Sequence, residues 1–123
     1  MIYTYFYLAT VYRKHAAGLD AAADEAARYA ADFLEAGIPV FSPVAYGHSV
    51  SKQSKGSSPG QFWDEVQLRF MQPADGLIVV QMDGWTVSEG IRGEIRWFRE
   101  ARRPIIYVGT QDPVGDFKRM EGV

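Results

Sequence analysis

The segment Gln81–Glu94 places a serine able to cap a helix ahead of a carboxylate two helical turns further on. Ser88 precedes a run with helical periodicity, so it can cap that helix and leave backbone N–H groups free at the positive end. Such a helix end suits phosphate or another anion. Gly90 has no side chain, which would let a ligand approach the helix and meet Glu94. A carboxylate so placed could attack an anomeric carbon and form a glycosyl-enzyme ester, as in retaining glycosidases.

The same spacing also fits a capped helix with an exposed glutamate, so the motif alone remains a hypothesis. Whether this motif forms a functional site depends on the helices and strands around it. The expected strands are Ile2–Ala9, Pro39–Phe41, Leu77–Val80 and Ile105–Val108, each a short apolar run. The expected helices are Asp20–Ala36, Gln61–Gln72 and Ser88–Arg102, and the remaining tail could add a short one.

Strands that alternate with helices predict an α/β fold of the Rossmann-like (flavodoxin-like) kind, in which a parallel sheet of four to five strands carries helices on both faces. The whole chain, residues 1–123, is expected to form one domain. Ligands bind such sheets at the carboxyl ends of the strands. That rule selects Ala9–Arg13, Ser42–His48 and Met82–Glu94 as the segments that surround the site.

A polar stretch, Val44–Gly60, follows the second expected strand and shows no periodicity. Long loops of this kind are usually functional or mobile, so the sequence predicts a lid that closes over the site. His48 in this stretch could hydrogen-bond a base or a phosphate, although a lone loop histidine is more often solvated. Trp63 and Trp85 could stack on a base, and packing roles fit them at least as well.

Composition narrows the ligand class. The chain has a net charge of -2 and no basic stripe, which argues against nucleic-acid binding and favours a small molecule. It has no cysteine, and its histidines and carboxylates form no spaced ligand set, so neither a metal nor another cofactor is expected.

The longest apolar run, Gly76–Met82, is too short to span a bilayer. A start on strand-like residues instead of a signal peptide predicts the cytoplasm.

Four motifs occur in an order that resembles a known superfamily. They are Tyr7-Leu8-Ala9-Thr10-Val11-Tyr12, Gly37-Ile38-Pro39-Val40-Phe41-Ser42-Pro43, Ala74-Asp75-Gly76-Leu77-Ile78-Val79-Val80, and Asp83-Gly84-Trp85 with Ser88, Gly90 and Glu94. Together they resemble the nucleoside 2-deoxyribosyltransferase-like superfamily, and most closely a small bacterial and phage branch of it. The resemblance covers nearly the whole chain.

The resemblance implies an enzyme, an N-glycosidase or (deoxy)ribosyltransferase, that cleaves or transfers at the N-glycosidic bond of a (deoxy)nucleoside or its 5′-monophosphate. The residue matching Glu94 is the nucleophile. The position of Ser88 is an aspartate in the transferases but a phosphate-contacting serine in the related deoxynucleoside 5′-monophosphate N-glycosidases, which points to a phosphorylated ligand. Another acid is expected near Gln67, which cannot ionise, so Asp64 is the candidate for that role. Relatives complete their sites across subunits, which implies a homo-oligomer.

The resemblance and the strand-end rule together give the expected substrate contacts. They are Tyr7, Ala9, Thr10, Tyr12, Arg13, Pro43, His48, Asp83, Gly84, Trp85, Ser88 and Gly90. Two other functions stay open: a nucleotide-binding module without catalysis, favoured by Gln67, and an NAD or phosphoribosyl-ester glycohydrolase. No G-x-G-x-x-G follows the first strand, so a dinucleotide oxidoreductase is not expected.

Overall fold

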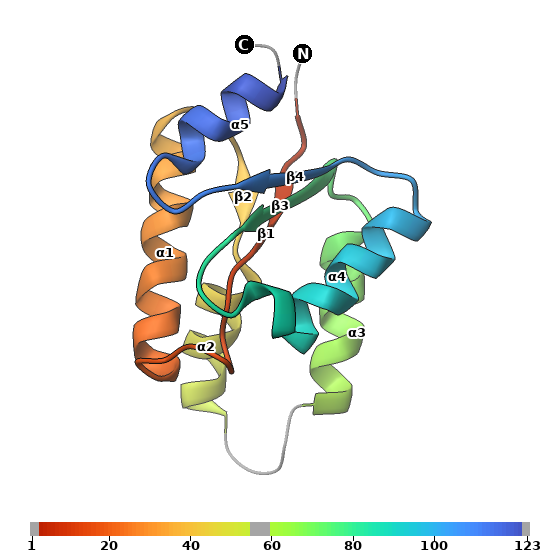
Figure 1. The fold of residues 1–123 in the computed structure, drawn as a ribbon. Helices are drawn as coiled ribbons and strands as arrows, with labels where there is room; N and C mark the ends of the chain where they lie inside the picture. Colours follow the sequence, from red (N-terminus) through yellow and green to blue (C-terminus); the bar gives the residue numbers. More distant parts are fainter. Residues whose placement is uncertain (1–2, 55–59, 122–123) are drawn as a thin grey trace.

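A four-stranded parallel sheet lies between two layers of helices (Figure 1) in the computed structural model, which describes residues 3–54 and 60–121. In chain order the elements are β1 (Phe6–Ala9), α1 (Leu19–Glu35), β2 (Val40–Phe41), α2 (Pro43–Gln53), α3 (Gly60–Met71), β3 (Gly76–Val80), the short 3-10 helix η1 (Trp85–Val87), α4 (Glu89–Glu100), β4 (Ile105–Val108) and α5 (Pro113–Glu121). The predicted α/β fold, with a parallel sheet and helices on both faces, is confirmed.

The strand order is β2-β1-β3-β4. The chain therefore moves from β1 to one side for β2, and then crosses β1 to the other side for β3. Along β1, Tyr7 pairs with Phe41 of β2 and with Leu77 of β3, and the last pair with β3 joins Ala9 to Val79. The reversal of strand order falls between β1 and β3, which is the place where open α/β sheets bind ligands.

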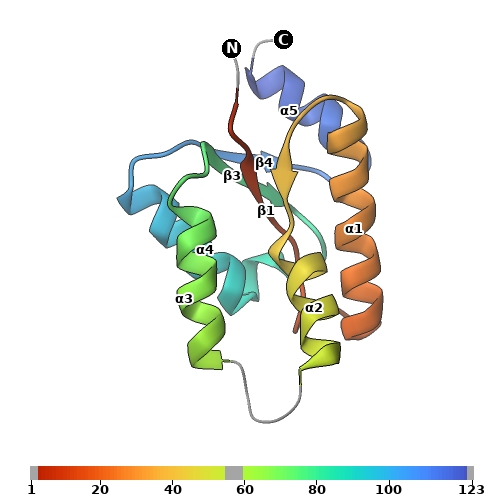
Figure 2. The same ribbon diagram turned by 180° about the vertical axis from the view of Figure 1, so that it is seen from behind.

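The two faces of β1 contact different helices, because successive side chains of a strand point to opposite sides. Phe6 meets Phe117 of α5 at a ring distance of 5.2 Å, and Phe117 meets Phe33 of α1 at 6.0 Å. Tyr7 instead meets Phe98 of α4 at 6.0 Å. Helices α1 and α5 therefore cover one face, while α3 and α4 lie on the other, as both views show (Figures 1 and 2).

The core is built on the two central strands, whose residues are all buried. This explains why β1 and β3 are apolar along their whole length: in a parallel sheet with helices on both faces, neither side of a central strand meets water. The observed β1 is shorter than the expected Ile2–Ala9. The Asp75 carboxylate accepts hydrogen bonds from the backbone N–H groups of Thr4 (2.6 Å) and Tyr5 (3.1 Å), so this acid anchors the approach to the strand.

The predicted polar loop Val44–Gly60 is wrong over most of its length, because Pro43–Gln53 forms helix α2. Ser42 caps this helix through its Oγ, which accepts from the N–H of Ala45 at 3.1 Å, and Pro43 occupies the first helical position. Serine followed by proline is a favoured helix start, which explains why a helix begins here and not a loop. The lid is therefore not supported for residues 44–53, and residues 55–59 lie outside the described part of the chain.

Candidate active site at the carboxyl edge of the sheet

The segments that follow β1, β2 and β3 gather at one edge of the sheet, at the end opposite the two chain termini (Figure 1). They bring together the loop after β1, the start of α2, and η1 with the first turn of α4. The three segments selected by the strand-end rule therefore share one edge. Among the helices that the structure describes, none is long and apolar enough to cross a membrane.

Glu94 lies on the inward face of α4, together with Ile91 and Phe98. The residue is only 9% exposed, so it is buried. It makes no hydrogen bond or ion pair with any residue described by the structure. Burial without such a partner disfavours the charged form and raises the pKa of Glu94 from an ordinary 4.5 to about 8. At neutral pH this carboxyl group is therefore mostly protonated.

Tyr7 and Gln67 lie around the same carboxyl group. Tyr7 is fully buried, and its hydroxyl forms no hydrogen bond of regular geometry within the described residues. Burial raises the pKa of Tyr7, and the nearby charge of Glu94 raises it further, while the side-chain amide of Gln67 lowers it. Strand β1 and helices α3 and α4 thus converge on one point, where a carboxyl, a phenol and an amide lie close together.

The first turn of α4 lies beside this point. Ser88 is buried, and its Oγ accepts from the N–H of Ile91 at 3.3 Å, which confirms the helix cap. The serine can still donate its own hydroxyl proton. Gly90 is exposed, and a Cβ added there would approach only the Ser88 hydroxyl, at 4.0 Å. Space next to the capping serine is therefore open, as the absence of a side chain at Gly90 suggested.

Thr10, directly after β1, carries a second buried polar atom without a partner. Its Oγ1 makes no hydrogen bond within the described residues, although the residue is only 3% exposed. Leaving a buried hydroxyl unpaired costs about 1–3 kcal/mol, so such groups are rare away from places where a ligand or water completes them. The buried hydroxyls of Tyr7, on β1, and of Thr10, directly after it, therefore both lack a hydrogen bond of regular geometry within the described residues.

A chain of polar side chains joins the loop after β1 to α2 and α1. His48 on α2 contacts the Tyr12 hydroxyl through Nδ1 at 2.8 Å and Asp20 through Nε2 at 2.7 Å. Lys52 completes the chain with an ion pair to Asp20 at 3.0 Å. A carboxylate can only accept, so in the neutral imidazole the proton is assigned to Nε2 and Tyr12 donates to Nδ1. Lys52 and His48 together lower the pKa of Asp20.

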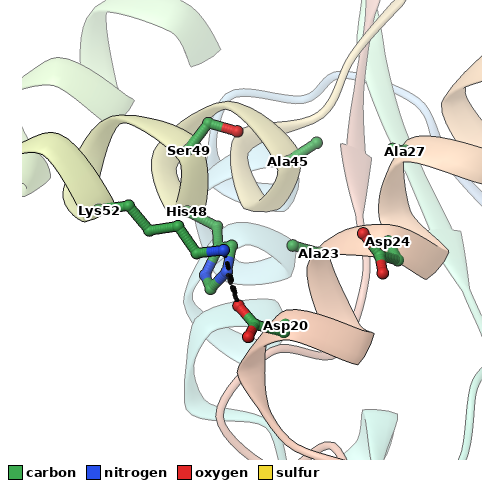
Figure 3. A pocket seen from close by; sticks show the side chains of 8 residues that line it. All are labelled: Asp20, Ala23, Asp24, Ala27, Ala45, His48, Ser49 and Lys52. Atoms are coloured by element: carbon green, nitrogen blue, oxygen red, sulfur yellow. Dashed lines mark hydrogen bonds and ion pairs between the residues drawn. The ribbon is translucent and has the colours of Figure 1, made fainter.

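Three of these side chains, those of Asp20, His48 and Lys52, line a hollow of about 360 Å³ between α1 and α2 (Figure 3). Asp20, His48 and Lys52 meet at one end of the hollow, where the ion pair between Asp20 and Lys52 links the two helices. Asp24 lies apart from that contact. Small side chains, Ala23 and Ala45, form part of the wall. Both ring nitrogens of His48 thus have protein partners, one of which is the Tyr12 hydroxyl.

We expect Tyr12→Phe to lower the free energy of unfolding by about 0.5–1.5 kcal/mol, because it removes the hydrogen bond to the half-buried imidazole of His48. The matched control is Tyr46→Phe, since Tyr46 is exposed and its hydroxyl makes no hydrogen bond within the described residues. Urea unfolding of both variants tests this. Equal stability of the two variants would show that the Tyr12–His48 contact contributes nothing.

The other candidate residues occupy more ordinary positions. Arg13 and Asp83 are exposed and form no ion pair within the described chain. Gly84 has the left-handed φ of 89° that its turn requires. The ring of Trp85 packs on Tyr107 at 5.6 Å. Two further candidates are backbone neighbours of the site: Ala9 ends β1, and Pro43 begins α2.

Asp64, the expected second acid, is exposed on α3 and makes no hydrogen bond or ion pair within the described residues. Gln67, one turn further, is the residue that α3 brings to Tyr7.

Sequence reasoning missed Asp20, because nothing in the spacing of Asp20 and His48 along the chain indicates that α1 and α2 meet. No described group of three histidine, cysteine or acidic side chains could hold a metal ion.

The family model described as "Domain of unknown function (DUF1937)" matches residues 4–110, which include every element from β1 to β4. The matched part holds Glu94, Tyr7, Gln67, Ser88 and the Tyr12–His48–Asp20 chain of contacts. No curated protein matches this chain.

Proposed function

The chain belongs to the DUF1937 family, and from its site we propose that it cleaves or transfers at the N-glycosidic bond of a (deoxy)nucleoside or its 5′-monophosphate, with Glu94 as the nucleophile. The observation that carries the proposal is the carboxyl group of Glu94, which is buried at the carboxyl edge of the sheet without a hydrogen-bond partner among the described residues. The resemblance to nucleoside 2-deoxyribosyltransferase-like enzymes in four motifs supports the same chemistry.

A buried carboxyl group with a strongly raised pKa and no structural partner is typical of functional sites, because a merely structural acid is paired or exposed. Tyr7 strengthens this interpretation. Its hydroxyl is also buried, makes no hydrogen bond of regular geometry within the described residues, and lies close enough to Glu94 for the charge of Glu94 to raise its pKa. A phenol that donates to the carboxylate would stabilise the ionised, nucleophilic form and hold it in one orientation.

In the proposed reaction, a carboxylate oxygen of Glu94 forms a bond with C1′ while the bond from C1′ to the base nitrogen breaks. The base leaves with that electron pair and needs a proton. Water, or a second base, then displaces Glu94 from the glycosyl ester and regenerates the carboxylate. Two displacements at C1′ retain its configuration.

The proton for the leaving base must come from a group other than Glu94. Glu94 carries a proton in the free protein at neutral pH, because its pKa is about 8. It attacks C1′ from the face opposite the leaving base, so this proton has to be lost to solvent before the attack and cannot pass directly to the base. Asp64 is exposed and Gln67 cannot ionise, so α3 offers no buried acid at Tyr7. We therefore propose a water molecule as the proton donor to the base.

We expect a 5′-monophosphate to bind more tightly than its nucleoside, since the Ser88 hydroxyl and the free N–H groups of α4 can hold an anion. The helix dipole adds only about 0.3–1 kcal/mol. Hydrogen bonds to the charged group, at roughly 1.5–3 kcal/mol each, must therefore supply most of the preference.

Ser88→Asp tests this subsite without removing the helix cap, because aspartate caps helices as well as serine does. Its negative charge should repel the phosphate, and the monophosphate preference should fall by about tenfold or more. Nucleoside affinity, measured in the same calorimeter, is the control. A monophosphate preference that survives this variant would place the phosphate elsewhere.

The decisive test of the reaction is incubation of the protein with a panel of nucleosides and 5′-monophosphates, followed by chromatography for free base. We expect release from at least one member. The second candidate function is a nucleotide-binding module, which is favoured by Gln67 at the place where an acid is expected. A ligand-induced rise in melting temperature without any base release would support that function over an enzyme.

The proposal extends to the setting of the reaction. We propose a small-molecule substrate, because the chain has a net charge of -2 and no basic stripe that would favour nucleic acid. We also propose a cytoplasmic homo-oligomer on the basis of the superfamily resemblance. Size-exclusion chromatography with light scattering would give the number of subunits directly.

A further inference from the structure

Three arginines line a shallow hollow on the outer side of α4. Arg92, Arg96 and Arg99 surround a space of about 230 Å³, with half-buried Ile95 as the remaining wall. They follow one another at spacings of four and three residues, so their side chains emerge from the same face of the helix. All three are exposed.

None of the three forms an ion pair or a side-chain hydrogen bond with any described residue. Glu89 and Glu100 lie on the same helix within reach by spacing, yet neither pairs with them. Like charges one turn apart repel each other, so this arrangement opposes helix formation unless an anion neutralises it.

Other cations of the chain show the contrast. Arg119 pairs with Asp116 at 2.5 Å, and Lys52 pairs with Asp20 at 3.0 Å. Arg103, just beyond α4, donates to the carbonyl oxygens of Met71 (3.2 Å) and Ala74 (2.8 Å). These groups have structural partners, whereas the three guanidinium groups on α4 share a hollow and face solvent.

The arginine cluster is separate from the candidate active site. Glu94 points inward with Ile91 and Phe98, and the arginines leave the helix on another side. A ligand on the arginines would therefore contact α4 from outside the fold, while a substrate at Glu94 would contact it from within. The two sites share only the helix.

We propose that Arg92, Arg96 and Arg99 form a second binding site, for a small molecule that carries a chain of two or three phosphate groups. Guanidinium groups offer forked donors that match phosphate oxygens, and several adjacent phosphates can engage several arginines at once. The inference does not depend on the proposed reaction at Glu94.

A short polyphosphate fits better than a long polyanion. The cluster extends over two helical turns, about 10 Å, which matches a few linked phosphates. The whole chain has a net charge of -2, and α1 presents exposed acids such as Asp24 and Asp32, so the long-range field repels an extended nucleic acid. A compact ligand that reaches only the arginines avoids that repulsion.

Calorimetric titration with inorganic tripolyphosphate tests the site. The double variant Arg96→Gln/Arg99→Gln should weaken binding by about tenfold or more, because two of three charge-assisted contacts are lost. The matched control is Arg69→Gln/Lys118→Gln, which removes the same charge from exposed positions on α3 and α5 and should change affinity by less than about twofold. Arginine Nε signals in NMR spectra would show which side chains respond.

Glu94→Gln protein should bind tripolyphosphate as the wild type does. Ser88→Asp protein should lose at most binding at the separate phosphate subsite and should keep the site at the arginines, which distinguishes this site from the proposed reaction and its phosphate subsite. Inorganic phosphate, which can engage fewer arginines, should bind more weakly. No tripolyphosphate binding by the wild type would overturn the inference. So would equal weakening in the two double variants, since that result would reflect net charge alone.

Discussion

Glu94→Ala should abolish base release from the substrate, with a rate loss of roughly 10³-fold or more, because removal of a nucleophile leaves only the contribution of binding and orientation. The effect should appear in the chemical step, since substrate contacts at the Ser88 end of α4 are untouched. Single-turnover assays by chromatography measure it, and Glu94→Gln, which keeps the shape but cannot attack C1′, should behave in the same way.

Glu89→Ala is the control for this experiment, because Glu89 is an exposed glutamate on the same helix with no partner among the described residues. Its rate should stay near that of the wild type. Circular dichroism and thermal unfolding of every variant exclude loss of fold as the cause. Wild-type rates in folded Glu94→Ala protein would remove Glu94 from the reaction.

Glu94 should also make the stability of the protein depend on pH, with a slope of about 1.4 kcal/mol per pH unit. Its pKa is raised from 4.5 to about 8 in the folded chain, so folding favours the protonated form. Below pH 4.5 both states hold the proton and stability is unaffected. As pH rises, the unfolded chain loses the proton first, and the folded state becomes progressively less favoured up to pH 8.

Glu94→Gln removes this titration. Relative to the wild type, the variant should therefore gain roughly 3–5 kcal/mol of stability between pH 4.5 and pH 8, apart from a constant offset. Urea unfolding at several pH values gives the two curves, and Glu89→Gln, an exposed change on the same helix, should run parallel to the wild type. If the Glu94→Gln curve also runs parallel, the carboxyl group is not buried as described.

The sequence was sufficient to predict the sheet because its central strands are apolar on both faces. Residues 77–80 lie within β3, and residues 105–108 are those of β4. The alternation of strands with helices then required parallel pairing and placed the site at the carboxyl ends. Strand order was not predicted, since it depends on which faces the crossover helices cover.

Helix α2 could not be recognised from periodicity. Gly47 and the serines of this segment dilute the apolar pattern, and only Pro43 is buried among its residues. Its position is set by contacts that are distant in sequence. A Cβ on Gly47 would come within 2.7 Å of the Trp63 ring, so α2 approaches α3 closely at a residue without a side chain.

Within the site, Ser88 and Glu94 were predictable because they belong to one helix, where spacing fixes relative position. The capping role of Ser88 is confirmed, and the catalytic role of Glu94 stays a prediction. Gln67 and Asp64 illustrate the limit of this reasoning. They lie one turn apart on α3, and only the packing of that helix decides that the amide of Gln67 lies near Tyr7 while Asp64 faces solvent.

The polar chain from Tyr12 through His48 and Asp20 to Lys52 has a consequence for local unfolding. It ties the loop after β1, the start of α1 and the middle of α2 into one cooperative unit, although His48 follows these partners by 36 and 28 residues. Detachment of α2 would break both His48 contacts at once and release Tyr12. The conformation of the loop after β1 therefore lasts only as long as α2 stays packed against α1, even though β1 itself is fully buried.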